Sequence, residues 1–156
     1  MKEKINIFIP HYGGDEKYIK KLKGLISKHG DYEIRDSSIV ESEPNDATNT
    51  EYIKSIIRPK IDWAGKVLVL IGPKTHEREW VNWEIEYAAK SGDKNIIGVF
   101  LPGSEDADTP KALEEFGNAC ITWDSDKIIS TIEGESIWMN SQGNIRPNAD
   151  IERLSC

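Results

Sequence analysis

The stretch that decides the fold is Lys66-Val-Leu-Val-Leu-Ile71, which is closed at once by Gly72-Pro73. It is apolar at every position from 67 to 71, whereas a half-exposed strand would alternate apolar and polar residues. Such a run is typical of a parallel strand that is covered by helices on both faces. We therefore expect Val67 to Ile71 to form a central strand of an α/β sheet.

Strand and helix patterns alternate on both sides of this run. Short apolar runs predict further strands at 5–9, 32–35, 95–101 and 120–123, and helical spacing predicts helices at about 15–28, 49–59, 75–90 and 112–116. Pro59 is expected to end or kink the second helix, and Thr75 to cap the third. The alternation implies a flavodoxin-like open sheet of about five mostly parallel strands with helices on both faces.

Length and composition indicate one globular domain. The 156 residues, 38% hydrophobic and 30% charged, fit a single domain spanning 1–156. Residues 124–156 form a C-terminal extension with no clear pattern apart from a possible hairpin that turns at 141–143. No segment reads as a linker between two domains.

Charge and cysteine content exclude several partners. The net charge of -7 would repel a polyanion, so a nucleic acid partner is not expected. No apolar run approaches the roughly 20 residues of a membrane span, and the charged N-terminus has no signal-peptide pattern. Cys120 and Cys156 are too far apart for a metal knuckle, so no metal is expected. The expected compartment is the cytoplasm, without contact to a membrane.

In open parallel sheets the ligand lies outside the carboxyl ends of the strands, so the loops there carry the chemistry. The candidate segments are 11–14, 35–49, 72–84 and 102–110. They contain neither GxGxxG nor GxxxxGK[ST], which argues against the Rossmann and P-loop classes. A phosphoacceptor receiver domain would need acidic residues at the ends of the first and third strands. Those ends read Pro10-His11 and Gly72-Pro73 here, which argues against that class.

Trp80 and Glu84 are the residues in these segments that point to chemistry. Four positions apart on a helix, they share one face, and an indole beside a carboxylate excludes water, which either raises the pKa of the acid or strengthens its charge interactions. The spacing alone also fits a structural alternative in which Trp80, Val81 and Ile85 are core residues and Glu84 is an exposed acid.

The segment from Val69 to Ile85 reads VLIGxxTxxxxWVxxEI and resembles the TIR-like domain of bacterial Thoeris defence proteins of the ThsB type. Phe8 to Tyr12 and Asn95 to Leu101 are similar to that family's first loop and fourth strand, so the resemblance covers about two thirds of the chain. It implies a TIR-like fold, NAD as the substrate with no bound cofactor, and Glu84 as the catalytic carboxylate.

One carboxylate suffices for this chemistry. Nicotinamide leaves a pyridinium ring as a neutral molecule and needs no acid, so one anion has only to stabilise the oxocarbenium-like charge. By position, the expected substrate-binding residues are His11, Tyr12, Gly13, Gly14, Asp36, Ser37, Ser38 and Trp80. For His11, a surface turn position is an equally good interpretation.

The function expected from the resemblance is NAD cleavage that yields a cyclic or conjugated ADP-ribose signal for a separate effector protein in anti-phage defence. Activity is expected to appear on self-assembly or after a phage-derived cue. Two alternatives remain open from fold analogy. One is an enzyme similar to nucleoside deoxyribosyltransferases, which use a glutamate nucleophile, and the other is a non-catalytic TIR-like adaptor.

Overall fold

The fold is described from a computed structural model, and the structure describes residues 3–11, 15, 17–30, 32–36, 50–75 and 79–146. The elements follow in the order β1 (Glu3–Phe8), α1 (Lys17–His29), β2 (Tyr32–Asp36), α2 (Thr50–Trp63), β3 (Lys66–Ile71), α3 (Glu79–Lys90), β4 (Asn95–Phe100), a 3-10 turn (Asp106–Asp108), α4 (Lys111–Phe116), β5 (Ala119–Thr122) and α5 (Ser125–Ile132).

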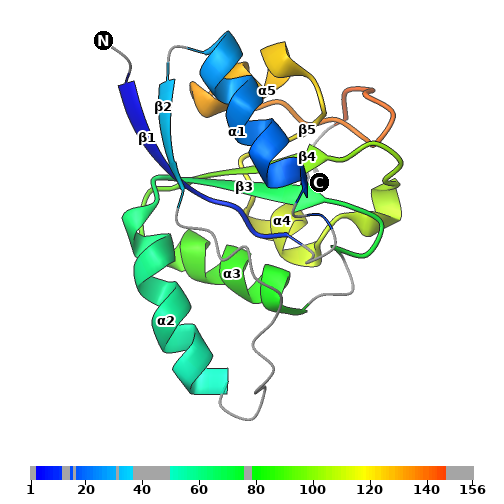
Figure 1. Cartoon of the computed structure of the whole chain (residues 1–156). Helices are drawn as coiled ribbons and strands as arrows, with labels where there is room; N and C mark the ends of the chain where they lie inside the picture. Colours follow the sequence, from blue (N-terminus) through cyan, green and yellow to red (C-terminus); the bar gives the residue numbers. More distant parts are fainter. Residues whose placement is uncertain are drawn as a thin grey trace.

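The five strands form one parallel sheet in the order β2-β1-β3-β4-β5 (Figure 1). Strand β3 is at the centre, and the residues from Val67 to Ile71 are completely buried. The prediction of a central strand in an open, parallel α/β sheet is therefore confirmed. Its uninterrupted apolar pattern follows from cover on both faces.

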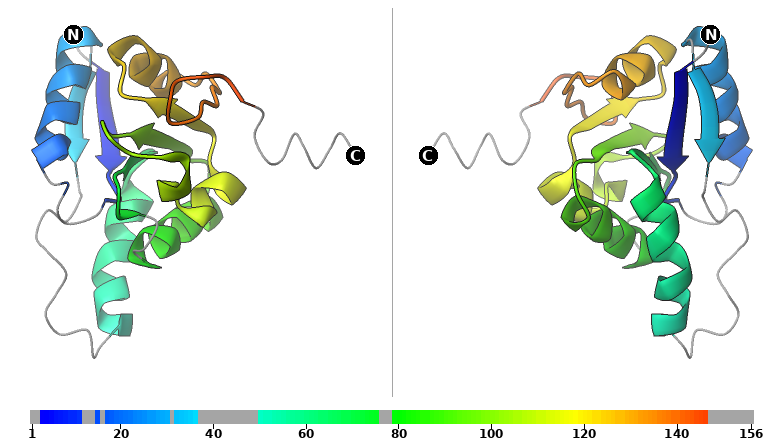
Figure 2. Two further views of the ribbon diagram at one scale, coloured as in Figure 1. Left: turned by 90° about the vertical axis from the view of Figure 1, so that its right-hand side faces the viewer. Right: turned by 90° about the vertical axis from the view of Figure 1, so that its left-hand side faces the viewer.

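The helices form two layers, one on each face of the sheet. Helices α1 and α5 cover one face, and α2, α3 and α4 cover the other, as Figures 1 and 2 show. Two separate hydrophobic clusters correspond to these layers, the first containing Leu22 and Ile128, the second Ile61 and Val81. Alternate residues of β3 enter each cluster, so the central strand joins both cores.

Strands β1 and β3 lie side by side for only a short distance. Their ladder pairs Ile7 with Lys66 and Phe8 with Val67. Beyond it, the Leu70 amide donates a hydrogen bond of 3.0 Å to the Pro10 carbonyl. The chain after β1 thus continues beside β3, which brings His11 to the carboxyl edge of the sheet.

The structure changes two local predictions, one at Pro59 and one at Thr75. Pro59 lies inside α2, which continues to Trp63. The carbonyl of Ser55, which loses its helical donor at Pro59, is in an exposed residue and can bind water instead. The Thr75 hydroxyl binds the preceding turn, and α3 is described from Glu79 onwards, so the predicted cap on the residues between them lies outside the described part of the chain.

The C-terminal part adds a helix that the sequence patterns did not predict. Asp124 accepts a hydrogen bond from the Lys127 amide and so caps α5, whose Ile128 and Ile132 are buried against the α1 layer. A bridge between Met139 and Ile145 closes the hairpin expected around 141–143. In the described part of the chain, no helix has the length and apolar character needed to cross a bilayer.

Candidate active site at the carboxyl edge of the sheet

The turn after β3 is fixed by one buried threonine. The Gly72 amide donates to Thr75 Oγ1 at 2.8 Å, and this hydroxyl donates to the Leu70 carbonyl at 3.2 Å. Thr75 is completely buried, so both bonds are shielded from water. These bonds hold the turn from Gly72 to Thr75 at the edge where a ligand would bind.

Asp15 packs directly on this turn, and Gly72 makes the approach possible. A Cβ atom added to Gly72 would collide with Asp15 Oδ2 and lie 2.9 Å from Cγ. Asp15 Oδ2 is fully covered and has no hydrogen-bond partner among the described residues. A buried carboxylate oxygen is costly to keep charged, so this position disfavours the ionised form of the side chain.

The pKa of Asp15 reflects that environment. Burial raises the pKa of the carboxyl group above its usual value, and the nearby charges of His11 and Lys17 lower it by less. Asp15 was not among the expected site residues, since at the start of a helical pattern it reads as a helix-initiating acid. Its burial depends on Gly72, 57 positions away, and no local pattern contains that contact.

His11 lies inside the protein at this edge. Only 7% of its surface is exposed, so the surface-turn alternative does not describe its position. Its Nδ1 is 2.8 Å from the Ile9 carbonyl. A carbonyl can only accept, so Nδ1 carries the proton of that bond, which fixes the orientation of the ring.

Helix α3 presents two different faces, one on each side of Glu84. Val81, Ile85 and Ala88 are buried in the core against the sheet. Trp80 begins a second face, which turns towards α2. Glu84, one turn after Trp80, lies between these two faces and is half-buried. A carboxylate there is screened by water less than one on the outer face.

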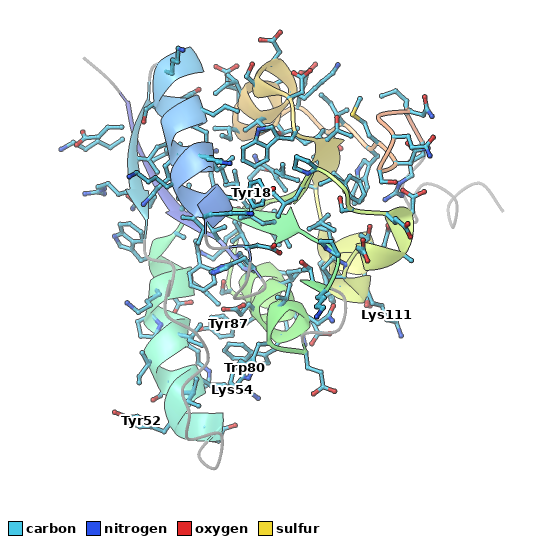
Figure 3. All side chains as sticks on the ribbon, turned by 45° about the vertical axis from the view of Figure 1, so that its right-hand side comes forward. Tyr18, Tyr52, Lys54, Trp80, Tyr87 and Lys111 are labelled. Atoms are coloured by element: carbon cyan, nitrogen blue, oxygen red, sulfur yellow. The ribbon has the colours of Figure 1, made fainter. Side chains whose placement is uncertain are left out.

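The face towards α2 is an aromatic ladder of Trp80, Trp83 and Tyr87. Trp80 and Trp83 meet edge to face, with ring centroids 5.6 Å apart, and Trp83 stacks on Tyr87 at the same separation. Two cations of α2 lie over Trp83, with Lys54 Nζ at 5.2 Å and the Arg58 guanidinium carbon at 5.9 Å from the ring centroid. Figure 3 shows Lys54 on α2 and Trp80 on α3, on the side of the molecule where these two helices meet.

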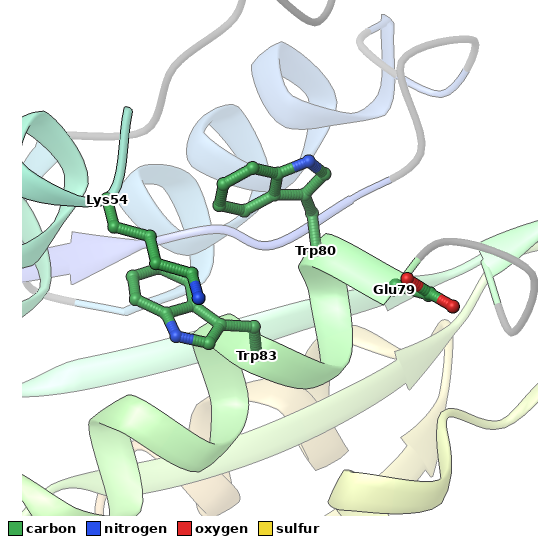
Figure 4. Close-up of a pocket in the computed structure, with 4 residues that line it drawn as sticks. All are labelled: Lys54, Glu79, Trp80 and Trp83. Atoms are coloured by element: carbon green, nitrogen blue, oxygen red, sulfur yellow. The ribbon is translucent and has the colours of Figure 1, made fainter. Parts of the chain in front are cut away.

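A pocket of about 220 Å³ opens between α2 and α3. Lys54, Glu79, Trp80 and Trp83 line it (Figure 4). The Glu79 carboxylate points away from Lys54 and the indoles, so among these four lining residues the charged group that faces the rings is the lysine. The sequence patterns singled out Trp80 but not Lys54, because the pocket depends on how α2 packs on α3.

The expected site residues are only partly within the described structure. Trp80 lines the pocket, Glu84 lies one turn further along α3, and His11 lies at the end of β1. Asp36 ends β2, with only its backbone described, and Tyr12, Gly13, Gly14, Ser37 and Ser38 lie outside the described residues. Among the described residues, no three His, Cys, Asp or Glu side chains gather in a way that could hold a metal ion.

Comparison with known proteins adds a family and a fold. Residues 8–106 match the family model described as Thoeris protein ThsB, TIR-like domain. None of the curated proteins matches the sequence at a significant level. The matched segment begins at the last residue of β1 and contains β2 to β4, α1 to α3 and all the site residues described above.

Solved structures share the fold at low sequence identity. A 2-deoxyribosyltransferase from Bacillus psychrosaccharolyticus superimposes with a TM-score of 0.57 and 13% identity, over 91% of this chain and 98% of that one. A putative pilus assembly-related protein from Burkholderia pseudomallei K96243 gives 0.52 and 13%, over 83% and 87%. At this identity the similarity concerns the fold alone.

Proposed function

Because the chain belongs to the family of TIR-like domains of the Thoeris protein ThsB, we propose that it is a TIR-type enzyme that cleaves NAD and releases nicotinamide. The observation that supports this most directly is the position of Trp80 and Glu84, on a helix that starts at the carboxyl edge of the central strand. Glu84 is the proposed catalytic carboxylate.

The proposed role of Glu84 is electrostatic. As the bond between the anomeric carbon and the pyridinium nitrogen breaks, its electron pair stays with nicotinamide, which leaves as a neutral molecule. Positive charge then develops on the ribose, and a nearby carboxylate stabilises it. The half-buried position of Glu84 favours this role, because water screens its charge less than at the surface.

The proposed product is a cyclic or conjugated ADP-ribose that signals to a separate effector protein in the cytoplasm. A hydroxyl oxygen of the substrate or of a second molecule bonds to the anomeric carbon, and the hydroxyl proton passes to solvent. The indoles of Trp80 and Trp83 beside the site favour such capture by keeping water away. We further propose that self-assembly or a phage-derived activator switches the enzyme on.

The decisive experiment incubates the purified chain with NAD, with and without a phage lysate, and measures products by mass spectrometry. Glu84→Gln should abolish nicotinamide release while the circular dichroism spectrum stays unchanged, since the substitution keeps volume and removes charge. Glu86→Gln is the matched control on the same helix and should retain most of the activity. Full activity in a folded Glu84→Gln variant would exclude the proposed role.

The second candidate is a base-exchange enzyme that acts on deoxynucleosides. The 2-deoxyribosyltransferase that shares the fold over 91% of this chain favours it. Incubation with a deoxynucleoside and a free second base would reveal it as an exchanged nucleoside. A chain that alters neither NAD nor deoxynucleosides with any lysate would instead be an adaptor that acts by binding partners.

A further inference from the structure

The sheet has a notch at its amino edge, where the parallel strands begin. Residues Glu3 to Ile7 of β1 pair with β2, whereas β3 starts only beside Ile7, at Lys66 (Figure 1). Among the described strands, none pairs with the first half of β1 on its second side. The end of α5 lines this gap, and a pocket of about 240 Å³ remains between the strands and the helix.

This pocket is separate from the candidate active site. Strand β3 has six residues, so at about 3.3 Å per residue roughly 17 Å separates Lys66 from the turn that follows Ile71. The described residues that line the pocket come from β1, β2, β3 and the end of α5, and they are Ile5, Tyr32, Lys66, Ile132 and Glu133. Both isoleucines are buried and give the pocket an apolar wall.

A second wall holds a carboxylate in a fixed position. Tyr32 is only 9% exposed, and its hydroxyl donates a hydrogen bond of 2.9 Å to Glu133 Oε2. The Tyr32 ring packs directly on Gly30, where an added Cβ atom would lie 2.6 Å from Tyr32 Cδ2. The close packing fixes the ring, and the ring orients the carboxylate of Glu133, although that residue is exposed to solvent.

A positive charge lines the same pocket. Lys66 is half-buried, and the described residues give it neither an ion pair nor a hydrogen bond. No ion pair joins it to Glu133, so both charges remain available to a ligand. A ligand with one charge would be attracted by one of these side chains and repelled by the other, whereas a zwitterion would be attracted by both.

We propose that this pocket binds a free α-amino acid with a small aliphatic side chain. The carboxylate of the ligand pairs with Lys66, its ammonium group pairs with Glu133, and its side chain contacts Ile5 and Ile132. Pockets for drug-sized ligands start at roughly 300 Å³, so about 240 Å³ fits a smaller molecule of this kind. The inference does not depend on NAD cleavage, because the pocket lies at the other edge of the sheet.

The test compares three ligands with one carbon skeleton and different charges. Isothermal titration calorimetry measures the binding of leucine, 4-methylpentanoate and leucinamide to the full-length wild-type chain. The second ligand lacks the ammonium group, and the third carries a neutral amide in place of the carboxylate, as the amino end of a peptide does. We expect leucine to bind at least about ten-fold more tightly than either analogue.

Two variants assign each charge to its partner. Glu133→Gln removes a negative charge but keeps an acceptor for the Tyr32 hydroxyl, so leucine and leucinamide should bind about ten-fold more weakly and 4-methylpentanoate should not. Lys66→Met should weaken leucine and 4-methylpentanoate by about ten-fold and spare leucinamide. Glu135→Gln and Lys111→Met change exposed residues outside the described lining and should leave all three affinities unchanged.

The inference is overturned if leucine does not bind the wild-type chain, or if either analogue binds as tightly as leucine. Leucinamide as tight as leucine would assign the pocket to the amino end of a peptide instead. Equal losses for all three ligands in a variant with the wild-type circular dichroism spectrum would also refute the pairing of charges. If Lys66→Met does not fold, the analogues and Glu133→Gln still decide the outcome.

Discussion

Gly72→Ala tests whether the packing of Asp15 on the β3 turn is as tight as the structure indicates. The added methyl group would collide with Asp15 Oδ2 and lie 2.9 Å from Cγ and 3.1 Å from Oδ1. The backbone of Gly72 cannot retreat without breaking its hydrogen bond to Thr75 Oγ1. The Asp15 side chain must therefore move.

The expected cost is that of overpacking a well-filled site, about 1–3 kcal/mol. For a chain of this length that corresponds to a fall in melting temperature of roughly 3–9 °C. Gly65→Ala is the matched control, because nothing lies within 4 Å of a Cβ atom at Gly65 and its backbone has no positive φ. Circular dichroism melts of both variants against wild type give the comparison.

A double-mutant cycle identifies the partner. In an Asp15→Ala background the collision is gone, so Gly72→Ala should cost at least about 1 kcal/mol less than in wild type. Equal costs in the two backgrounds, or a Gly72→Ala variant as stable as Gly65→Ala, would refute the contact between Asp15 and Gly72.

Four further predictions concern the same chain. Thr75→Val should lower the free energy of unfolding by about 1–3 kcal/mol in urea titrations, because the buried Gly72 amide loses its acceptor. An unchanged free energy of unfolding would show that the turn does not depend on the hydroxyl. Burial raises the pKa of Asp15, so the folded chain keeps that proton to higher pH than the unfolded chain, and stability is lost as pH rises between the two pKa values. The stability of Asp15→Asn relative to wild type should therefore increase as pH rises above about 4, the ordinary value of an aspartate, and a difference that does not change with pH would contradict this. Burial raises the pKa of Cys120 to about 12, so in a Cys156→Ser variant the native chain should resist alkylation and react only after unfolding. If residues 1–156 form one domain, tryptophan fluorescence and far-ultraviolet circular dichroism should report the same unfolding transition, and two separated transitions would indicate two units.

The elements that the sequence predicted well are those whose own residues determine them. The run from Val67 to Ile71 is apolar at every position because both of its faces are covered, and that pattern is visible without knowing what covers it. Helix α3 shows its buried face in the spacing of Val81, Ile85 and Ala88. The placement of Trp80 and Glu84 at the carboxyl edge followed from those two patterns together.

The missed features depend on contacts between distant segments. The hydroxyl of Thr75 can accept a hydrogen bond from a helix that follows it or donate one to the strand that precedes it. Which of these it does depends on how the turn folds back on the Leu70 carbonyl. Helix α5 has eight residues, too few for a clear periodic signal, and it is stabilised by packing near α1. Asp15 and Lys54 belong to the candidate site only because of the segments packed against them.

The position of β5 limits where a smaller fragment could be cut. The segment that carries the family match ends at residue 106, before β5 and α5. Truncation after residue 106 would remove β5 and make β4 an edge strand. The backbone groups of β4 that now pair Ile97 with Ala119 and Val99 with Ile121 would then be exposed to other chains. Unpaired apolar edges of this kind recruit strands from neighbouring molecules. A fragment prepared for crystallisation or binding assays should therefore retain the residues through α5, since a shorter one invites aggregation regardless of how well its site is preserved.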